Sequence, residues 1–189
     1  MSNPWLQDPQ LIAAAEAIKA GGVVAYPTEG VWGLGCLPED TQAVNRILDM
    51  KGRSPEKGLI LVAANLNQVS PWLDTLSSRE MAQLRESWPG PNTWLVPHQG
   101  KVPVLVTGIH DKVAIRVSAH PVVQALCELC GSALVSTSAN PQGAPAAVNE
   151  QEVRAYFGAS LDALAPGEVQ TPGKASRIRD LETGAEIRP

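Results

Sequence analysis

Short, largely apolar runs alternate with amphipathic stretches along this chain, and this alternation most limits what it can fold into. The runs are Val23–Tyr26, Leu59–Val62, Val113–Val117 and Ala133–Ser136. Apolar runs of this length, bounded by turn residues, are typical of strands in the interior of a sheet. Because helical patterns separate them, the sequence predicts an α/β fold with a central mixed sheet and flanking helices.

Capping residues mark the predicted helices. Asp8 and Pro9 begin the first one, and Ser77 with Glu80 forms a capping box for another. Thr41 is predicted to cap a second helix, Asn149 and Glu152 to open another, and Val122–Leu129 to be helical. Further strands are predicted at Thr93–Val96, Ile178 and Ile187. Pro97–Asp111 shows no clear element and is too short to be an interdomain linker. A chain of 189 residues suits one hydrophobic core, so we predict a single domain over residues 1–189.

The charge balance argues against a nucleic-acid-binding surface that covers the whole molecule. The chain has 15 basic and 19 acidic side chains, a formal net charge of -4. Strong nonspecific binding to nucleic acid requires many contacts between Lys or Arg and phosphate. The basic residues gather instead at Lys51–Lys57 and Lys174–Arg179, which favours a local anion site.

We expect no membrane contact, no redox pair and no metal ligands from the protein. The apolar stretch Leu11–Ile18 is too short to span a bilayer and contains Glu16, so a cytoplasmic protein is expected. Cys127 and Cys130 form a C-x-x-C near the end of a helical pattern, whereas redox pairs usually lie at a helix start. Buried structural cysteines are therefore favoured. The three histidines form no cluster.

Four polar segments lie where apolar runs end, which is where α/β sheets usually bind ligands. They are Pro27–Gly35, Lys51–Gly58, Ser136–Gly143, and Arg116 with the basic stretch Lys174–Arg179. Lys51, Arg53 and Lys57 suit a polyphosphate, because Arg offers a bidentate fork and Lys a mobile charge. Alternatively, Lys51 and Arg53 only complement the end of the preceding helix. The phosphate loop G-x-x-x-x-G-K-[ST] does not occur in the sequence.

The other segments also allow two interpretations. The glycines of Pro27–Gly35 permit close approach to a ligand, or only a hairpin in which Thr28 satisfies backbone groups. The hydroxyl and amide side chains of Ser136–Gly143 suit a nucleotide, or only a capped turn. Arg116 is expected to share a strand face with Ala114 and to have a carboxylate partner, either within the protein or on a ligand.

Taken in order, these motifs resemble the YrdC/TsaC family of threonylcarbamoyl-AMP synthases, in its short bacterial form. The resemblance rests on Tyr26–Glu29 with Gly33–Gly35, Lys51–Arg53 leading to Gly58–Ile60, Trp88–Pro91 with Thr93, Ala114–Arg116, and Ser136–Asn140. It implies an open twisted sheet with a basic concave face. It also implies that L-threonine, bicarbonate and ATP give threonylcarbamoyl-AMP and pyrophosphate with the help of Mg²⁺. A partner transferase complex then modifies the adenosine beside the tRNA anticodon.

The resemblance also implies roles for eight residues. Those expected to bind ATP are Lys51, Arg53, Lys57, Ser138 and Asn140, with Lys51 and Arg53 catalytic. Those expected to bind threonine are Thr28, Arg116 and Ser176, with Arg116 holding its carboxylate. Gly30, Val62 and Arg177 depart from the commoner family pattern of Thr, His and Thr, and they are left out of the expected site.

The implied chemistry fits these residue types. A carbamate formed from threonine and bicarbonate attacks the α-phosphate, and fixed cations with Mg²⁺ stabilise the developing charge. Two other functions use the same kind of anion site. One is a module that binds double-stranded RNA or tRNA, and the other is a transferase that uses carbamoyl phosphate.

Overall fold

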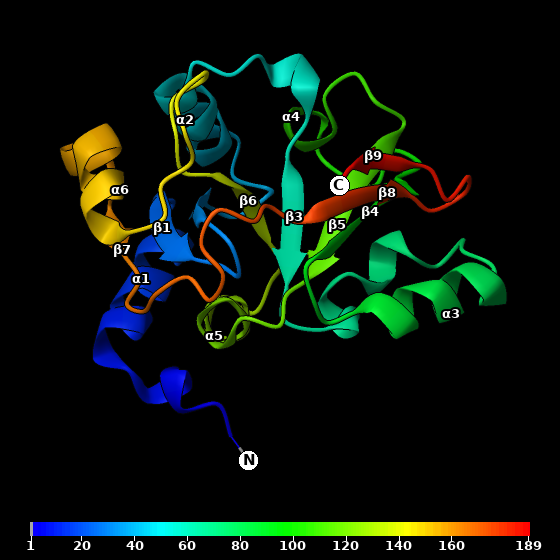
Figure 1. Cartoon of the computed structure of the whole chain (residues 1–189), viewed down its shortest axis with the longest axis horizontal. Helices are drawn as coiled ribbons and strands as arrows, with labels where there is room; N and C mark the ends of the chain where they lie inside the picture. Colours follow the sequence, from blue (N-terminus) through cyan, green and yellow to red (C-terminus); the bar gives the residue numbers. More distant parts are fainter. Residues whose placement is uncertain (1) are drawn as a thin grey trace.

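A single mixed sheet with helices on both faces makes up this α/β fold, as the sequence predicts (Figure 1). The computed structural model describes residues 2–189. The strand order is β7-β1-β2-β6-β3-β5-β4-β8-β9. The strands are β1 (Val24–Pro27), β2 (Trp32–Gly35), β3 (Ile60–Ala63), β4 (Asn92–Pro97), β5 (Lys112–Val117), β6 (Leu134–Ser138), β7 (Ala163–Leu164), β8 (Arg177–Asp180) and β9 (Glu186–Arg188).

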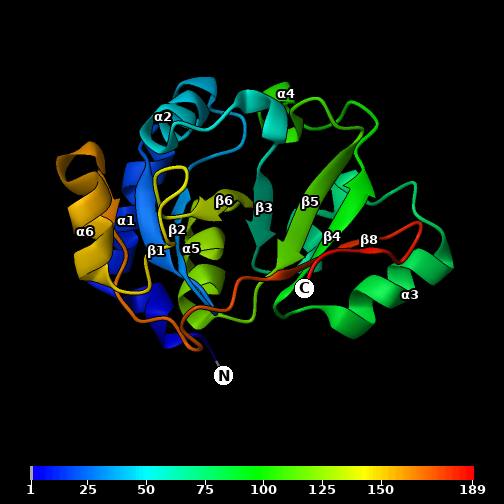
Figure 2. The same ribbon diagram turned by 45° about the horizontal axis from the view of Figure 1, so that its top comes forward.

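Strand pairs of both directions occur in this sheet. The pairs β3–β5, β4–β8 and β1–β7 are parallel, and the other pairs are antiparallel. Figure 2 shows β3 and β5 side by side near the middle of the molecule, with β1 and β2 toward one end. Segments far apart in the sequence therefore meet over the central strands.

Side-chain caps define most helix starts, as the sequence predicts. The helices are α1 (Pro9–Lys19), α2 (Thr41–Lys51), α3 (Ser78–Ser87), α4 (Val104–Thr107), α5 (Pro121–Cys130) and α6 (Glu150–Phe157). Asp8, Ser77 and Asn149 each accept a backbone N–H of the first turn of α1, α3 and α6. The cap of α2 is Asp40 and not Thr41, because the Asp40 carboxylate accepts the Ala43 N–H at 3.0 Å.

The core has two parts, one on each face of the sheet. Successive side chains of β3 point to opposite faces, so Leu61 packs with α2 residues such as Ile47, and Val62 packs with α5 residues such as Leu126. Helices α1 and α5 pack against one another over the second face. Among the described residues, no helix is long and apolar enough to cross a membrane.

Three short elements are not apparent from the sequence pattern. Strand β2 contains two glycines, which weaken strand formation. A Cβ at Gly35 would lie 2.6 Å from both the Tyr26 ring and the Val135 carbonyl oxygen, so close packing requires glycine there. Helix α4 has only four residues and is rich in β-branched side chains, and β7 has only two residues.

The burial of the cysteines agrees with the structural role that the sequence favours, except that Cys130 is only half-buried. Cys36 and Cys127 are buried, Cys130 is half-buried, and all three are free thiols. Burial raises the pKa of Cys130 to about 11 and that of Cys36 to about 12. Thiols with a raised pKa carry little thiolate at neutral pH and are poor nucleophiles.

Candidate functional site

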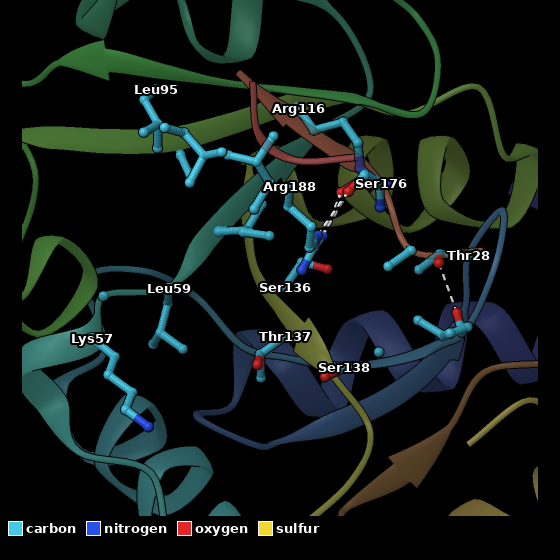
Figure 3. A pocket seen from close by; sticks show the side chains of 18 of the residues that line it. Thr28, Lys57, Leu59, Leu95, Arg116, Ser136, Thr137, Ser138, Ser176 and Arg188 are labelled. Atoms are coloured by element: carbon cyan, nitrogen blue, oxygen red, sulfur yellow. Dashed lines mark hydrogen bonds between the residues drawn. The ribbon is translucent and has the colours of Figure 1, made fainter. Parts of the chain in front are cut away.

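A cavity of about 650 Å³ lies over the central strands, and it gathers most of the predicted site residues (Figure 3). The residues that line it come from the turn between β1 and β2, the loop before β3, the segment 106–111, strand β5, the end of β6, and the late segment that runs from Lys174 to β9. Thr28, Arg53, Lys57, Arg116, Ser138 and Ser176 all line it. Lys51 and Asn140 do not line it but lie directly behind the end of β6.

Basic side chains outnumber acidic ones in the cavity wall. The basic ones are Arg53, Lys57, Lys112, Arg116, Lys174 and Arg188, and the acidic ones are Glu29, Asp111 and Asp180. Lys112 is paired with Asp180 at 2.7 Å, and Arg116 is paired with Glu29. Within residues 2–189, the four remaining cations form no salt bridge. Cations without an internal carboxylate partner suit an anionic ligand.

Arg116 lies on the floor of the cavity beside Ala114, as the strand alternation predicts. It is 6% exposed, and its Nη1 lies 3.0 Å from Glu29 Oε2. The other carboxylate oxygen of Glu29 accepts the Ser118 hydroxyl at 2.8 Å and the Ala119 N–H at 3.0 Å. In the described part of the chain, Arg116 Nε is buried without a hydrogen-bond partner. A buried donor of this kind is rare and fits an acceptor supplied by a ligand.

Thr28 fulfils both of the interpretations that the sequence leaves open. Strands β1 and β2 form an antiparallel hairpin, and the Thr28 hydroxyl donates to the Val31 carbonyl at 2.7 Å within its turn. The same turn forms one wall of the cavity. The hydroxyl oxygen retains acceptor capacity for a ligand N–H or O–H.

The Lys51 ammonium group is buried beneath the end of β6. It donates to the Ser138 carbonyl in a short contact, to the Asn140 carbonyl at 2.8 Å and to the Asn140 side-chain oxygen at 3.4 Å. The Lys51 carbonyl in turn accepts the Gln142 N–H at 2.7 Å. Burial, and then repulsion from Arg53, lower the pKa of Lys51 to about 8. Lys51 thus fixes the backbone that presents Ser138 to the cavity.

The Arg53 side chain does not bind the carbonyl groups at the end of α2. Gly52, with φ 60°, ends that helix, and the Gly52 and Arg53 N–H groups bind the carbonyls of its last turn. The Arg53 guanidinium instead donates to the Gly58 carbonyl, at 2.9 Å from Nη2 and 3.3 Å from Nε. Arg53 is half-buried, and this burial lowers its pKa. Lys57 is exposed on the same loop.

Ser176 and Arg188 form a part of the cavity wall that comes from the late part of the chain. The Ser176 hydroxyl lies 2.9 Å from that of Thr93, and the Arg188 guanidinium donates to the Ser176 carbonyl at 2.8 Å and to its hydroxyl at 3.1 Å. Burial, and then repulsion from Arg116, lower the pKa of Arg188. Arg188 is not among the site residues that the sequence predicts, and the only signal for it is a basic residue next to Ile187 in a short strand.

The three departures from the family pattern lie in different surroundings. Gly30 lines the cavity, whereas Val62 is buried in the core beside Arg116 and under α5. Arg177 is exposed on β8 and does not line the cavity. Only Gly30 is therefore placed to act directly on a ligand.

Comparison with known proteins relates this site to one family. The family model Sua5_yciO_yrdC, described as "Telomere recombination", matches residues 16–188. A threonylcarbamoyl-AMP synthase of Cellvibrio japonicus is 49% identical over 185 residues, which cover 98% of each chain. One of Pseudomonas aeruginosa is 53% identical over 176 residues, 93% of this chain and 95% of the relative.

Solved structures show the same fold. P. abyssi Sua5 complexed with L-threonine superposes with a TM-score of 0.86 at 32% identity, and a variant of that protein does so with 0.89. This chain is covered to 93% and 95%, but it spans only 52% and 56% of those Sua5 chains. E. coli YciO has a TM-score of 0.83 over 94% of this chain and 87% of its own, and its 24% identity supports the fold alone.

Proposed function

The chain belongs to the Sua5/YciO/YrdC family, and from this membership we infer that it is a threonylcarbamoyl-AMP synthase. It converts L-threonine, bicarbonate and ATP into threonylcarbamoyl-AMP and pyrophosphate, for threonylcarbamoyl-adenosine formation in tRNA. One observation on the cavity supports this function most directly. Among residues 2–189, a single cavity combines four cations that have no carboxylate partner with a buried Arg116 Nε–H that has no acceptor.

The nucleotide is proposed to lie along the wall that carries Arg53, Lys57 and Ser138. Arg53 and Lys57 form no salt bridge within residues 2–189, so their charges are available to phosphate oxygens, although Arg53 also donates to the Gly58 carbonyl. We propose that Lys51 adds its charge from behind and, together with Asn140, holds the carbonyl groups at the end of β6. A positive field fixed before ATP binds requires no reorganisation when charge develops on the phosphates.

Threonine is proposed to lie at the end of the cavity formed by Thr28, Arg116 and Ser176. Its carboxylate would accept the Arg116 Nε–H, which removes the unsatisfied donor. Glu29 keeps the guanidinium in place, so the carboxylate meets a preorganised partner. The hydroxyls of Thr28 and Ser176 are the neutral hydrogen-bonding groups on either side.

The reaction then needs position and charge stabilisation more than a protein nucleophile. The threonine amine adds to bicarbonate and water is lost, which gives a carbamate. A carbamate oxygen attacks the α-phosphorus, a P–O bond forms, and the bond to the bridging oxygen breaks with pyrophosphate as leaving group. We propose that Arg53 and Lys57 of the cavity wall stabilise the negative charge that develops on the phosphates.

The site residues fit an Mg²⁺ ion that is carried by the nucleotide. In the described part of the chain, no group of three or more His, Cys, Asp or Glu side chains is arranged to hold a metal. Mg²⁺ usually keeps several waters and binds substrate phosphates with only one or two carboxylates. When bound, the ion would neutralise phosphate charge, and Asp111 or Asp180 of the cavity wall would supply a carboxylate.

The product implies partners beyond the small substrates. We propose that a tRNA threonylcarbamoyl transferase complex consumes threonylcarbamoyl-AMP, and that the enzyme works in the cytoplasm, where tRNA and ATP occur together. Direct contact with tRNA would use the exposed cations Lys57 and Lys174 at the cavity rim. Such contact would weaken steeply with salt.

Pyrophosphate release from ATP tests this function. The complete mixture of threonine, bicarbonate, Mg²⁺ and ATP should release pyrophosphate, and omission of threonine or bicarbonate should stop the release. Unchanged release without threonine would overturn the assignment. If the chain released no pyrophosphate and bound double-stranded RNA in a salt-sensitive way, the RNA-binding alternative would replace it.

A further inference from the structure

Gly30 is a glycine for reasons of space and not of backbone conformation. It is buried in the turn between β1 and β2, and it is not among the glycines with positive φ. A Cβ built on Gly30 would lie 1.5 Å from the carbonyl oxygen of Lys174 and 2.5 Å from its carbonyl carbon. Both atoms belong to the backbone, so no side-chain rotation relieves the overlap.

The segment that meets Gly30 is the strap, which we define as residues 168–176. The Gln170 and Thr171 N–H groups donate to the Glu29 carbonyl at 3.1 and 2.7 Å, and the Gly173 N–H donates to the Gly30 carbonyl at 2.9 Å. The strap is thus hydrogen-bonded along the same turn that bears Thr28 and Glu29. It runs from there to Ser176, toward the cavity wall shown in Figure 3.

The ends of the strap are anchored independently of Gly30. Near its start, the Glu168 carbonyl lies 2.9 Å from the buried His120 Nε2. At its end, Ser176 is held by Thr93 and Arg188. Between these anchors, residues 171–175 are exposed and contain no helix or strand. The backbone contacts with Glu29 and Gly30 therefore determine how closely the middle of the strap approaches the turn between β1 and β2 and the cavity.

We propose that Gly30 is a positioning residue that lets the strap close the threonine end of the cavity. The proposal rests on the proposed function, because it assigns threonine to the space between Thr28, Arg116 and Ser176. Any side chain at position 30 requires the turn and the Lys174 backbone to move apart by more than 1 Å, since Cβ atoms essentially never approach other heavy atoms closer than 3.0 Å. A displacement of about 1 Å in a positioning element is enough to reduce turnover by about 100-fold.

The variant Gly30→Ala tests the proposal through two readouts. Trypsin cleavage after Lys174, followed by mass spectrometry, reports whether the strap is held down, and it needs no substrate. We expect cleavage at least tenfold faster than in the parent. Steady-state kinetics should show a threonine KM raised at least tenfold, with the ATP KM within twofold of the parent.

Two further variants keep the outcome interpretable. Gly131→Ala replaces the left-handed glycine (φ 67°) that ends α5, where the added Cβ meets no atom within 4 Å. It therefore controls for a general loss of stability and should leave the Lys174 cleavage rate and the threonine KM unchanged. Pro172→Gly loosens the exposed middle of the strap without adding an atom at position 30, so it should raise both quantities. If Gly30→Ala fails to fold, Pro172→Gly provides the test alone.

Parental cleavage rates and parental threonine KM values in the folded Gly30→Ala and Pro172→Gly proteins would overturn the proposal. Faster cleavage with an unchanged threonine KM would also overturn it, because the strap would then not position threonine. If the parent itself released no threonine-dependent pyrophosphate, the proposed function would fall, and the cleavage rates would still decide whether Gly30 holds the strap.

Discussion

Glu29 Oε2 lies 3.0 Å from Arg116 Nη1, while Nε of the same guanidinium has no partner within residues 2–189. One edge of Arg116 is therefore used to hold the side chain in place, and another donor remains for a ligand. Glu29 and Arg116 lie 87 residues apart in the sequence, so this arrangement exists only in the folded protein.

Glu29→Ala should be strongly destabilising. Both side chains of the pair are mostly buried, at 13% and 7% exposure, so removing the carboxylate leaves an unpaired buried cation. Loss of one partner of such a pair lowers the free energy of unfolding by about 3–5 kcal/mol. Urea denaturation measures this change. Glu16→Ala, which removes the exposed pair with Lys19, is the control and should cost well under 1 kcal/mol. Equal effects of the two variants would contradict a buried ion pair.

The pH dependence of kcat/KM for ATP should report Lys51. Its pKa is about 8, below the ordinary value of 10.5, and kcat/KM reports groups of the free enzyme. We expect kcat/KM to fall as pH rises through about 8, because the ammonium charge is lost. In Lys51→Arg this decrease should vanish, since Arg stays protonated. The same decrease in Lys51→Arg would assign it to another group.

The contribution of Lys51 to the free energy of unfolding should rise with pH, whereas its contribution to kcat/KM should fall. Below pH 8 the folded and unfolded chains both carry the Lys51 charge, and its burial reduces stability. Between pH 8 and 10.5 the unfolded chain binds more protons than the folded one, so the Lys51 contribution to the free energy of unfolding rises with pH. Comparing the parent with Lys51→Met by urea denaturation at pH 7 and 10 isolates this contribution. It is contradicted if the difference between the two proteins stays constant.

Arg53→Ala should reduce turnover much more than stability. The guanidinium lies in the cavity wall, and within residues 2–189 its one hydrogen-bond acceptor is the Gly58 carbonyl. Loss of one donor that stabilises transition-state charge costs about 100- to 1,000-fold in kcat. Arg79→Ala, on the exposed face of α3, is the matched control and should behave like the parent. Pyrophosphate release and melting temperature measure the two effects, and parental turnover in Arg53→Ala would remove Arg53 from the site.

Selectivity for threonine over serine should be limited. The two substrates differ by one methyl group, and one methyl in an apolar pocket discriminates by about 10- to 200-fold in kcat/KM. Competition between the two amino acids, with mass detection of both adenylates, measures the ratio. A ratio far above this range would require a second selection step, such as selective hydrolysis of the serine product.

The sequence predicts the fold well where the pattern is local. Capped helices and long apolar runs carry their signal in a few adjacent residues, so α1, α3 and β3 are recognised directly. The cavity depends instead on contacts across the chain. Arg188 reaches Ser176 only because β8 and β9 pair, and Gly30 meets Lys174 only because the strap returns over the turn. No local pattern carries information on such contacts.

The contacts of Lys51 also cannot be predicted from the sequence, although the motif that contains it is recognised. A cationic loop after a helix indicates an anion site, and Arg53 and Lys57 do line the cavity. The motif does not reveal that the Lys51 side chain turns toward the backbone of residues 138–140, which is 87 residues further on. That direction depends on where the end of β6 lies relative to α2.

The pairing of β1 with β7 and of β4 with β8 has a consequence for protein synthesis. Val24 pairs with Ala163, and Asn92 pairs with Arg177, so the sheet joins early and late parts of the chain. The cavity obtains Ser176 and Arg188 only after β8 and β9 have been made. A nascent chain that stops before β8 therefore lacks a working site, and contacts this distant in sequence slow folding. Binding of threonine is thus expected to begin only after β8 and β9 have been translated and paired.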